Sequence, residues 1–511
     1  MNWWEQAAIS IAVFLPAAGA LVIALLPRDR ERLIRGTGVL VTGAALAVGV
    51  AMLFGFDYSA GTVLQFEVEA SWISAIDANY HMGIDGISLP LFELTLLLSF
   101  LCAVYTWKIV PEPGKTKAFL ALTLLLQTGM AGTFVAFDLV LFFVFWELVL
   151  VPMYFLIGIW GSANRAYAAI KFFLYTLFGS VFMLLGFLGM YFRSEPNTFD
   201  ILELQRFAQG AGFSDTFQLV AFAGVFLGFA IKVPMWPFHT WLPDAHTEAP
   251  TIGSVLLAGI LLKMGAYGFI RIAFPILPDA AVEWAPWIGL LGAIAIIYGA
   301  LACLAQRDLK RLIAFSSVGH MGFVMLGIAT MTEVGINAAI FGMVAHGVIT
   351  GMLFFEVGSI YDRYHTRQIA EIGGGMMQKI PYLAGIFAFT AIASLGLPGL
   401  AGFWGEVMAL LSAFSPAGVL EGWTGLFRAL MIAGGVGTIL TAGYFLWMLQ
   451  RVNMGTLPDR WRDEALVDVN RVEWVAWAPL LFGILLLGLF PRLVLGVTEE
   501  AVSEVVGLFA G

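Results

Sequence analysis

Six ionisable side chains stand inside stretches of the sequence that are otherwise apolar. Glu147, for example, lies in FFVFWELVLVPM. If these stretches lie in lipid, each charge costs about 2.5 kcal/mol or more, so the side chains must face one another or water. Acids, amines and imidazoles placed in this way can pass protons between them. The six residues are Glu147, Lys232, Lys263, His320, His346 and Glu406.

A structural explanation also exists for these residues. A histidine inside a membrane, such as His346, often forms only a hydrogen bond between helices. Glu147 and Lys232 could form a structural ion pair, although buried ion pairs seldom stabilise a protein more than apolar side chains of similar volume. Lys263 has no obvious carboxylate beside it in the sequence. We expect it to carry protons, because burial without a partner disfavours the charged amine.

Five further titratable side chains are expected near the ends of apolar stretches or in a short connection between two of them. A carboxylate or imidazole at the membrane surface is in contact with water and needs no special explanation. These five residues are Glu93, Asp138, His239, His246 and Glu356.

The composition predicts an integral membrane protein with a single domain. Of the 511 residues, 60% are hydrophobic and only 12% are charged, which is far from the composition of soluble domains. The net charge of −9 and the lack of a basic run argue against a nucleic-acid partner. Cys102 and Cys303 lack CxxC or Cys/His spacing. We therefore expect no metal site, iron–sulfur cluster or disulfide framework.

Fourteen apolar runs have about the 20 residues that a helix needs to cross a bilayer. The predicted fold is therefore an all-α membrane bundle of about 14 transmembrane helices. The first run is expected to be a helix and not a signal peptide, because its arginines follow the apolar run. The expected spans are 5–26, 33–55, 89–109, 117–136, 138–160, 166–192, 215–236, 250–273, 283–304, 309–330, 334–358, 381–413, 426–450 and 473–497.

The basic residues predict the orientation of the bundle. If successive loops alternate between the two sides, 19 of the 26 lysines and arginines fall on one side and five on the other. Lysine and arginine concentrate in cytoplasmic loops. Both termini are therefore expected on the outer, periplasmic side of the cell membrane. The two remaining basic residues, Lys232 and Lys263, lie within spans.

Two of the expected spans contain breaks. Pro234 follows Lys232 in the seventh span, and LGLPGLAG around Pro398 precedes Glu406 in the twelfth. Proline removes a backbone donor, and broken helices in lipid are tolerated where they line protein or water.

The spacing of these breaks predicts an internal repeat. Shifting spans four to eight by the 164 residues between Pro234 and Pro398 places them approximately on spans nine to thirteen. Each block has an odd number of helices, so the two blocks run in opposite directions. The pattern predicts two inverted five-helix repeats, over 117–273 and 283–450, as in secondary transporters.

Four segments closely resemble the antiporter-like membrane subunits of proton-pumping NADH:quinone oxidoreductase, respiratory complex I, and the resemblance covers essentially the whole chain. Three such subunits, called L, M and N, occur in the bacterial complex. The chain resembles one of these three types in its length and in Glu406, because the other two types carry lysine at the position of Glu406. The segments are FFVFWELVLVPMYFLIGIWG, AIKVPMWPFHTWLPDAHTEAPTIGSVLLAGILLKMGAYG, RDLKRLIAFSSVGHMGFV and LGLPGLAGFWGE.

The resemblance implies a role for each buried group. Together they would form a polar axis in the plane of the membrane that moves protons, coupled to electron transfer in other subunits. Opening the ion pair at its start would make the first lysine a better proton donor to the second. The implied roles are Glu147, input carboxylate; Lys232, its partner on a broken helix; Lys263, central lysine; His320 and His346, linking histidines; Glu406, exit carboxylate.

The resemblance also implies partners and the location of cofactors. No part of the sequence matches a site for quinone, flavin, NADH or a cluster, so flavin, iron–sulfur clusters and quinone are expected in other subunits. The chain is then a subunit of a translocase and carries no redox centre itself. Expected partners are the other membrane subunits, including two sister antiporter-like subunits, together with membrane lipid and protons.

Two other functions stay open. The chain could belong to a multisubunit cation/proton antiporter, a relative that shares the Glu–Lys–Lys constellation. It could also be an inert scaffold for assembly, although a scaffold gives no reason to bury six titratable groups.

Overall fold

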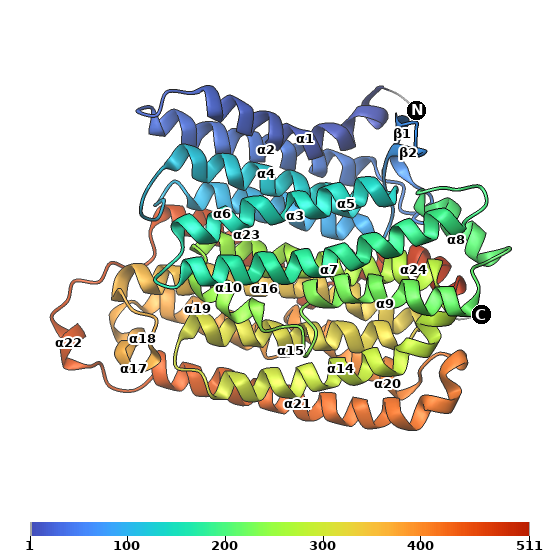
Figure 1. Cartoon of the computed structure of the whole chain (residues 1–511). Helices are drawn as coiled ribbons and strands as arrows, with labels where there is room; N and C mark the ends of the chain where they lie inside the picture. The colour runs from blue at the N-terminus through green and yellow to red at the C-terminus, as the bar shows by residue number, and fades with distance from the viewer. Residues whose placement is uncertain (1–2, 510–511) are drawn as a thin grey trace.

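The computed structural model of the chain describes residues 3–509, as a bundle of long helices that lie side by side (Figure 1). Among the described residues, 13 helical segments are long and apolar enough to cross a membrane. Two shorter apolar helices, α19 (Pro381–Ser394) and α20 (Gly402–Phe414), cover the twelfth predicted span. The predicted helical membrane bundle is therefore confirmed.

The first seven spans are built as follows. The fifth is divided at Val149, and the seventh ends at Lys232, where a short helix continues the chain after a break at 233–240. Pro234 and Pro237 lie in this break, as predicted. The helices are α1 (Trp3–Leu25), α2 (Glu31–Gly55), α3 (Ser88–Tyr105), α4 (Thr116–Val135), α5 (Leu139–Leu148), α6 (Leu150–Trp160), α7 (Arg165–Arg193), α9 (Asp215–Lys232) and α10 (Trp241–Glu248).

The eighth span is the most enclosed of the described part, since the side chains of its apolar window are all buried inside the protein. It is also irregular. Two turns have the wider π geometry, η1 (Leu257–Leu261) and η2 (Phe269–Ala273). They alternate with the α-helical pieces α11 (Thr251–Leu256), α12 (Leu262–Gly268) and α13 (Phe274–Ile276).

The remaining spans differ in how much of their surface is buried. α15 and α16 are almost entirely buried, whereas α21 and α23 expose many apolar side chains, as expected for surfaces that face lipid. The helices are α14 (Pro278–Leu304), α15 (Leu309–Ala329), α16 (Glu333–Tyr364), α17 (Ile369–Ile372), α18 (Met376–Lys379), α19, α20, η3 (Gly418–Trp423), α21 (Thr424–Val452), α22 (Asp459–Arg462), α23 (Arg471–Leu489) and α24 (Arg492–Gly507).

Three features of the fold were not expected from the apolar runs. An antiparallel hairpin of β1 (Gln65–Ile73) and β2 (Ala78–Ile84) occupies the connection between the second and third spans. α8 (Ile201–Gln209) follows the sixth span. The last predicted span, 473–497, is too long, because α23 ends at Leu489 and α24 begins after Pro491. Residues before a proline disfavour the helical conformation, which explains this boundary.

Candidate functional site

Lys263 lies at the centre of the bundle and is completely buried. It is placed on α12, between the two π turns η1 and η2. Such wide turns interrupt the regular pattern of helical hydrogen bonds and occur frequently at functional sites. The Nζ atom of Lys263 donates to the carbonyl oxygen of Ala258 within η1. The local irregularity of the helix thus supplies a backbone acceptor for the buried amine.

The amine of Lys263 also reaches across to α16. Its Nζ atom lies 2.6 Å from Nδ1 of His346, which is 6% exposed. The ring of His346 lies 5.6 Å from the ring of His320 on α15, measured between centroids. Nε2 of His346 is buried and has no hydrogen-bond partner among the described residues. The predicted central lysine and the two predicted linking histidines are therefore neighbours.

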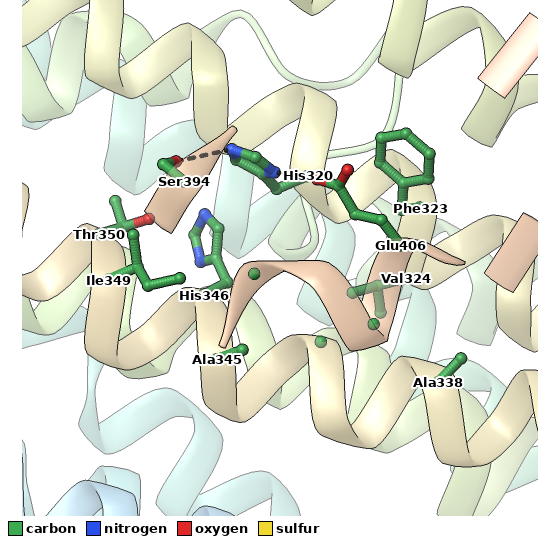
Figure 2. Close-up of a pocket in the computed structure, with 13 residues that line it drawn as sticks. His320, Phe323, Val324, Ala338, Ala345, His346, Ile349, Thr350, Ser394 and Glu406 are labelled. Carbon is green, nitrogen blue, oxygen red and sulfur yellow. Dashed lines mark hydrogen bonds and ion pairs between the residues drawn. The ribbon is translucent and has the colours of Figure 1, made fainter. Parts of the chain in front are cut away.

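His320 connects both halves of the broken twelfth span. Its Nδ1 atom lies 2.9 Å from Oε1 of Glu406 on α20, and its Nε2 atom lies 3.1 Å from Oγ of Ser394 at the end of α19. Figure 2 shows these side chains around a small cavity into which His346 also points. The break at 395–401 allows one ring to contact both helix ends.

The cavity in Figure 2 has a volume of about 30 Å³. This is enough for about one water molecule, and polar lining is needed to hold it. His320, His346, Thr350 and Glu406 supply that lining. Lys263 and His346, and likewise His320 and Glu406, lie within the hydrogen-bonding distance that proton transfer between side chains requires.

Glu147 and Lys232 do not form the direct ion pair that the sequence predicted. Within residues 3–509, no hydrogen bond or ion pair joins the two side chains. Lys232 is 1% exposed, and its Nζ atom lies 4.7 Å from the centre of the Trp146 ring. That ring is fixed by a hydrogen bond of 2.9 Å from its Nε1 atom to Oγ of Ser180. The amine is therefore held by an aromatic face, while Glu147 is half-buried beside the division of the fifth span.

The site residues form two groups. Glu147 and Lys232 lie in one group, while Lys263, His346, His320 and Glu406 form a file of contacts in the other. No hydrogen bond joins Lys232 to Lys263 in the part of the chain that the structure describes. The elements that carry them nevertheless pack closely, because a Cβ atom on Gly265 of α12 would lie 2.8 Å from Cγ2 of Val233, next to Lys232.

Two titratable residues that were expected at the membrane surface are fully buried in the bundle. His246 on α10 stacks on Phe354, with ring centroids 4.7 Å apart, and neither of its ring nitrogens has a partner among the described residues. Glu356 on α16 accepts a hydrogen bond of 2.9 Å from Oγ1 of Thr390. Glu356 is buried because α16 extends to Tyr364, beyond the predicted end of its span. His246 is buried because α10 lies against the buried helix α15.

The other three residues of that group are also less exposed than expected. His239 is 3% exposed, and Glu93 is half-buried. Asp138 is fully buried because it caps α5, where its Oδ1 atom accepts from the backbone N–H groups of Val140 and Leu141. An aspartate two or three residues before such donors is a recognisable capping signal in the sequence.

His81 lies outside the spans, at the point where the hairpin meets α8. Its Nδ1 atom lies 2.5 Å from Oδ2 of Asp200, and its Nε2 atom lies 2.9 Å from Oε1 of Glu67. Burial alone would lower the pKa of His81. The two carboxylates outweigh this effect and raise the pKa to about 9. The imidazolium thus joins β1, β2 and the N-terminus of α8. A buried ion pair between Asp85 and Arg271 lies close to this site, since both residues line the same cavity as Glu67.

Neither cysteine lines the cavity of this site. Cys102 and Cys303 are free and buried. In the described range 3–509, no three histidine, cysteine, aspartate or glutamate side chains come together as metal ligands.

The chain is similar to known membrane proteins along nearly its whole length. The family model described as NADH:quinone oxidoreductase/Mrp antiporter, TM matches residues 136–431. NADH-quinone oxidoreductase subunit M of Rhodobacter capsulatus is 41% identical, over 98% of the chain and 96% of the relative. The protein of the same name from Rickettsia bellii is 39% identical, over 99% of each chain.

Solved structures with the same fold come from different complexes. A chain of respiratory complex I from Thermus thermophilus matches with a TM-score of 0.86 and 29% identity, over 98% of this chain and 100% of that one. A chain of the Mrp complex from Dietzia matches with a TM-score of 0.84 and 22% identity, over 100% of both chains. The second similarity concerns the fold alone.

Proposed function

The chain belongs to the NADH-quinone oxidoreductase subunit M family, and from this premise we propose that it translocates protons across the membrane. In this proposal the protons move along a buried axis, and their movement is coupled to electron transfer in other subunits. The axis consists of Glu147, Lys232, Lys263, His346, His320 and Glu406.

The observation that carries the proposal is the file of contacts from Lys263 to Glu406. It joins four helices, α12, α16, α15 and α20, through side chains that can each gain or lose a proton. A purely structural link would need one hydrogen bond between two helices. A row of four titratable groups in a lipid-embedded core is costly and is typical of proton pathways.

The first two residues supply the coupling in this proposal. Lys232 lies over the ring of Trp146, the residue directly before Glu147, although the two charged side chains are not in contact. We propose that the direct pair forms during part of the cycle only. Loss of the carboxylate from the neighbourhood of Lys232 makes this amine a better donor, and its proton then moves towards Lys263. Bridging water is needed between the two lysines.

The broken helices support this function through their positions. The break at 233–240 follows Lys232 directly, and the break at 395–401 lies between Ser394 and Glu406. If two inverted repeats cover 117–273 and 283–450, the ends of the broken helices lie at matching places in them. Each repeat would then have access to a different side of the membrane. The inverted repeat stays a prediction.

The proposed setting is a multisubunit complex in the plasma membrane. Its proposed partners are the other membrane subunits, including the sister subunits L and N. Flavin, iron–sulfur clusters and quinone are assigned to other subunits, so the chain contributes proton movement to the translocase and no electron transfer.

The alternative of a cation/proton antiporter subunit has less support. The match to the Mrp complex is at 22% identity and supports the fold, whereas the subunit M relatives are up to 41% identical over nearly the whole chain. The scaffold alternative does not explain why four titratable side chains lie next to one another from Lys263 to Glu406.

The test uses His320→Asn in the assembled complex, since asparagine can form hydrogen bonds but cannot carry the proton. We expect proton translocation by membrane vesicles to fall about a hundredfold, while electron transfer from NADH to an artificial acceptor is retained. The control is His365→Asn, because His365 is exposed at the end of α16. Normal translocation by the His320 variant would show that the file of contacts is structural.

A further inference from the structure

A second cavity, unrelated to the file of titratable groups, lies between α2, α3, α16, α23 and α24. Its volume is about 710 Å³, which is within the range of about 300–1,000 Å³ of ligand sites. Most of its lining is apolar. Representative residues are Leu46, Leu94, Val348 and Leu486.

Two ionisable side chains, one acidic and one basic, line this groove. Glu93 lies on α3, and its Oε1 atom is buried without a hydrogen-bond partner. Arg492 is the first residue of α24 and is exposed. Across residues 3–509, neither side chain takes part in an ion pair. A carboxylate in an apolar groove costs free energy unless a donor or cation satisfies it.

The groove makes room for this carboxylate. A Cβ atom on Gly49 of α2 would lie 2.7 Å from both oxygens of Glu93 and 2.5 Å from Cδ1 of Leu96, so glycine at this position lets both side chains pack against α2. The carboxylate of Glu93 is therefore packed against α2 in the wall of the groove.

The charged groups lie at one level of the bundle. α2 ends at Gly55, α3 begins five residues before Glu93, and α23 ends three residues before Arg492. All three helix ends are on the same side when the spans alternate in direction. The apolar lining then extends from this end into the bundle, to Val348 and Gly483. A ligand with a charged head and a long apolar part matches this distribution.

We propose that the groove binds a zwitterionic phospholipid. Its ammonium group is held by Glu93, its phosphate by Arg492, and an acyl chain lies along the apolar wall. Arginine matches phosphate oxygens geometrically, and ammonium–carboxylate hydrogen bonds are charge-assisted. An anionic lipid without the ammonium group would satisfy Arg492 but leave Glu93 unpaired. The site therefore prefers lipids that carry both charges.

The test measures lipid binding to the purified, delipidated complex by native mass spectrometry, with phosphatidylethanolamine or phosphatidylglycerol as the probe. Wild type is expected to prefer phosphatidylethanolamine at one site by about tenfold, as one charge-assisted hydrogen bond would give. Glu93→Gln should abolish this preference, and Arg492→Gln should weaken the binding of both lipids. The controls are Glu283→Gln and Arg428→Gln, which change exposed groups elsewhere.

Equal binding of both lipids by wild type, or an unchanged preference in Glu93→Gln, would overturn the proposal. Loss of a neighbouring subunit from either variant on a native gel would also overturn it, because the groove would then be a protein interface. If the subunit carrying Glu93→Gln does not fold at all, Gly49→Ala replaces it. The added methyl group displaces the carboxylate together with the side chain of Leu96 and should abolish the same preference.

Discussion

Lys263 combines features that a structural cation does not need. It is completely buried, it contacts a backbone carbonyl and a histidine, and no carboxylate forms an ion pair with it in the described part of the chain. A permanent charge in this position would lack a counter-ion. An amine that is neutral for part of the time avoids this cost, and release of its proton to His346 is one step of the proposed axis.

Substituting Lys263 by arginine separates charge from proton release. Arginine keeps the positive charge but effectively never loses its proton in proteins. If Lys263 releases a proton in each cycle, Lys263→Arg should reduce proton translocation about a hundredfold in an assembled complex. The measurement is proton uptake by membrane vesicles, together with assembly on a native gel and artificial-acceptor activity.

The opposite result would come from a lysine that only supplies charge. The arginine variant would then lose no more than overpacking explains, about 1–3 kcal/mol of stability. Near-normal translocation would therefore show that the path uses His320 and water without the central lysine.

His81 predicts a pH dependence outside the membrane. Its pKa is about 9 in the folded protein and about 6.5 in an unfolded chain. Its contribution to stability is therefore fully present below about pH 6.5 and is lost as the pH rises through about 9. Hydrogen exchange of residues 65–84, corrected for the intrinsic rate, should become faster above that pH. In His81→Gln the exchange should be faster at all pH values and lose this dependence. Protection of the wild-type hairpin that does not change through pH 9 would contradict the assignment.

The approach of α12 to the end of α9 controls how the two groups of site residues lie relative to each other. A Cβ atom on Gly265 would be 2.7 Å from the carbonyl oxygen of Phe229 and 2.8 Å from Cγ2 of Val233. Gly265→Ala must therefore move α12 away from Lys232. We expect a marked loss of proton translocation with assembly retained, and a loss of stability of about 1–3 kcal/mol.

Gly385→Ala on α19 is the matched control for this substitution, because nothing lies within 4 Å of the added Cβ atom. Both variants are assayed for translocation and for thermal stability of the complex. Equal activity of the two would mean that the spacing between α9 and α12 has no influence on transfer.

At the scale of elements, the sequence predicted the spans and breaks because apolar length and proline act locally. The buried groups at Lys232 and Lys263 were found for the same reason, since a charge within an apolar run is visible without a structure. The missing contact between Glu147 and Lys232 depends on where Trp146 lies in three dimensions. No local pattern gives that position.

One other element, β1, had a sequence signal that a search for apolar runs does not detect. Residues 66–72 alternate between apolar and polar side chains, which is the pattern of a half-buried strand, and they form most of β1. The burial of His246 had no such signal. It depends on the packing of the short α10 against distant helices, among them α16, which carries Phe354.

At the scale of the whole molecule, the distribution of basic residues predicts that the connection between α1 and α2 is cytoplasmic and that the β1–β2 hairpin is on the outer side. Asp29 and Ser74 are exposed in these two places. Single Asp29→Cys and Ser74→Cys variants allow each side to be labelled, and the native Cys102 and Cys303 are buried and contribute little background.

In spheroplasts, a membrane-impermeant maleimide should label Ser74→Cys at once and Asp29→Cys only after permeabilisation. The expected difference follows from α2, which joins the two positions by a single apolar crossing of 25 residues. The predicted orientation then places the charged end of the lipid groove in the outer leaflet. Labelling of both positions from one side would exclude a crossing by α2. Labelling of Asp29→Cys alone would reverse the orientation of the bundle and assign the groove to the inner leaflet.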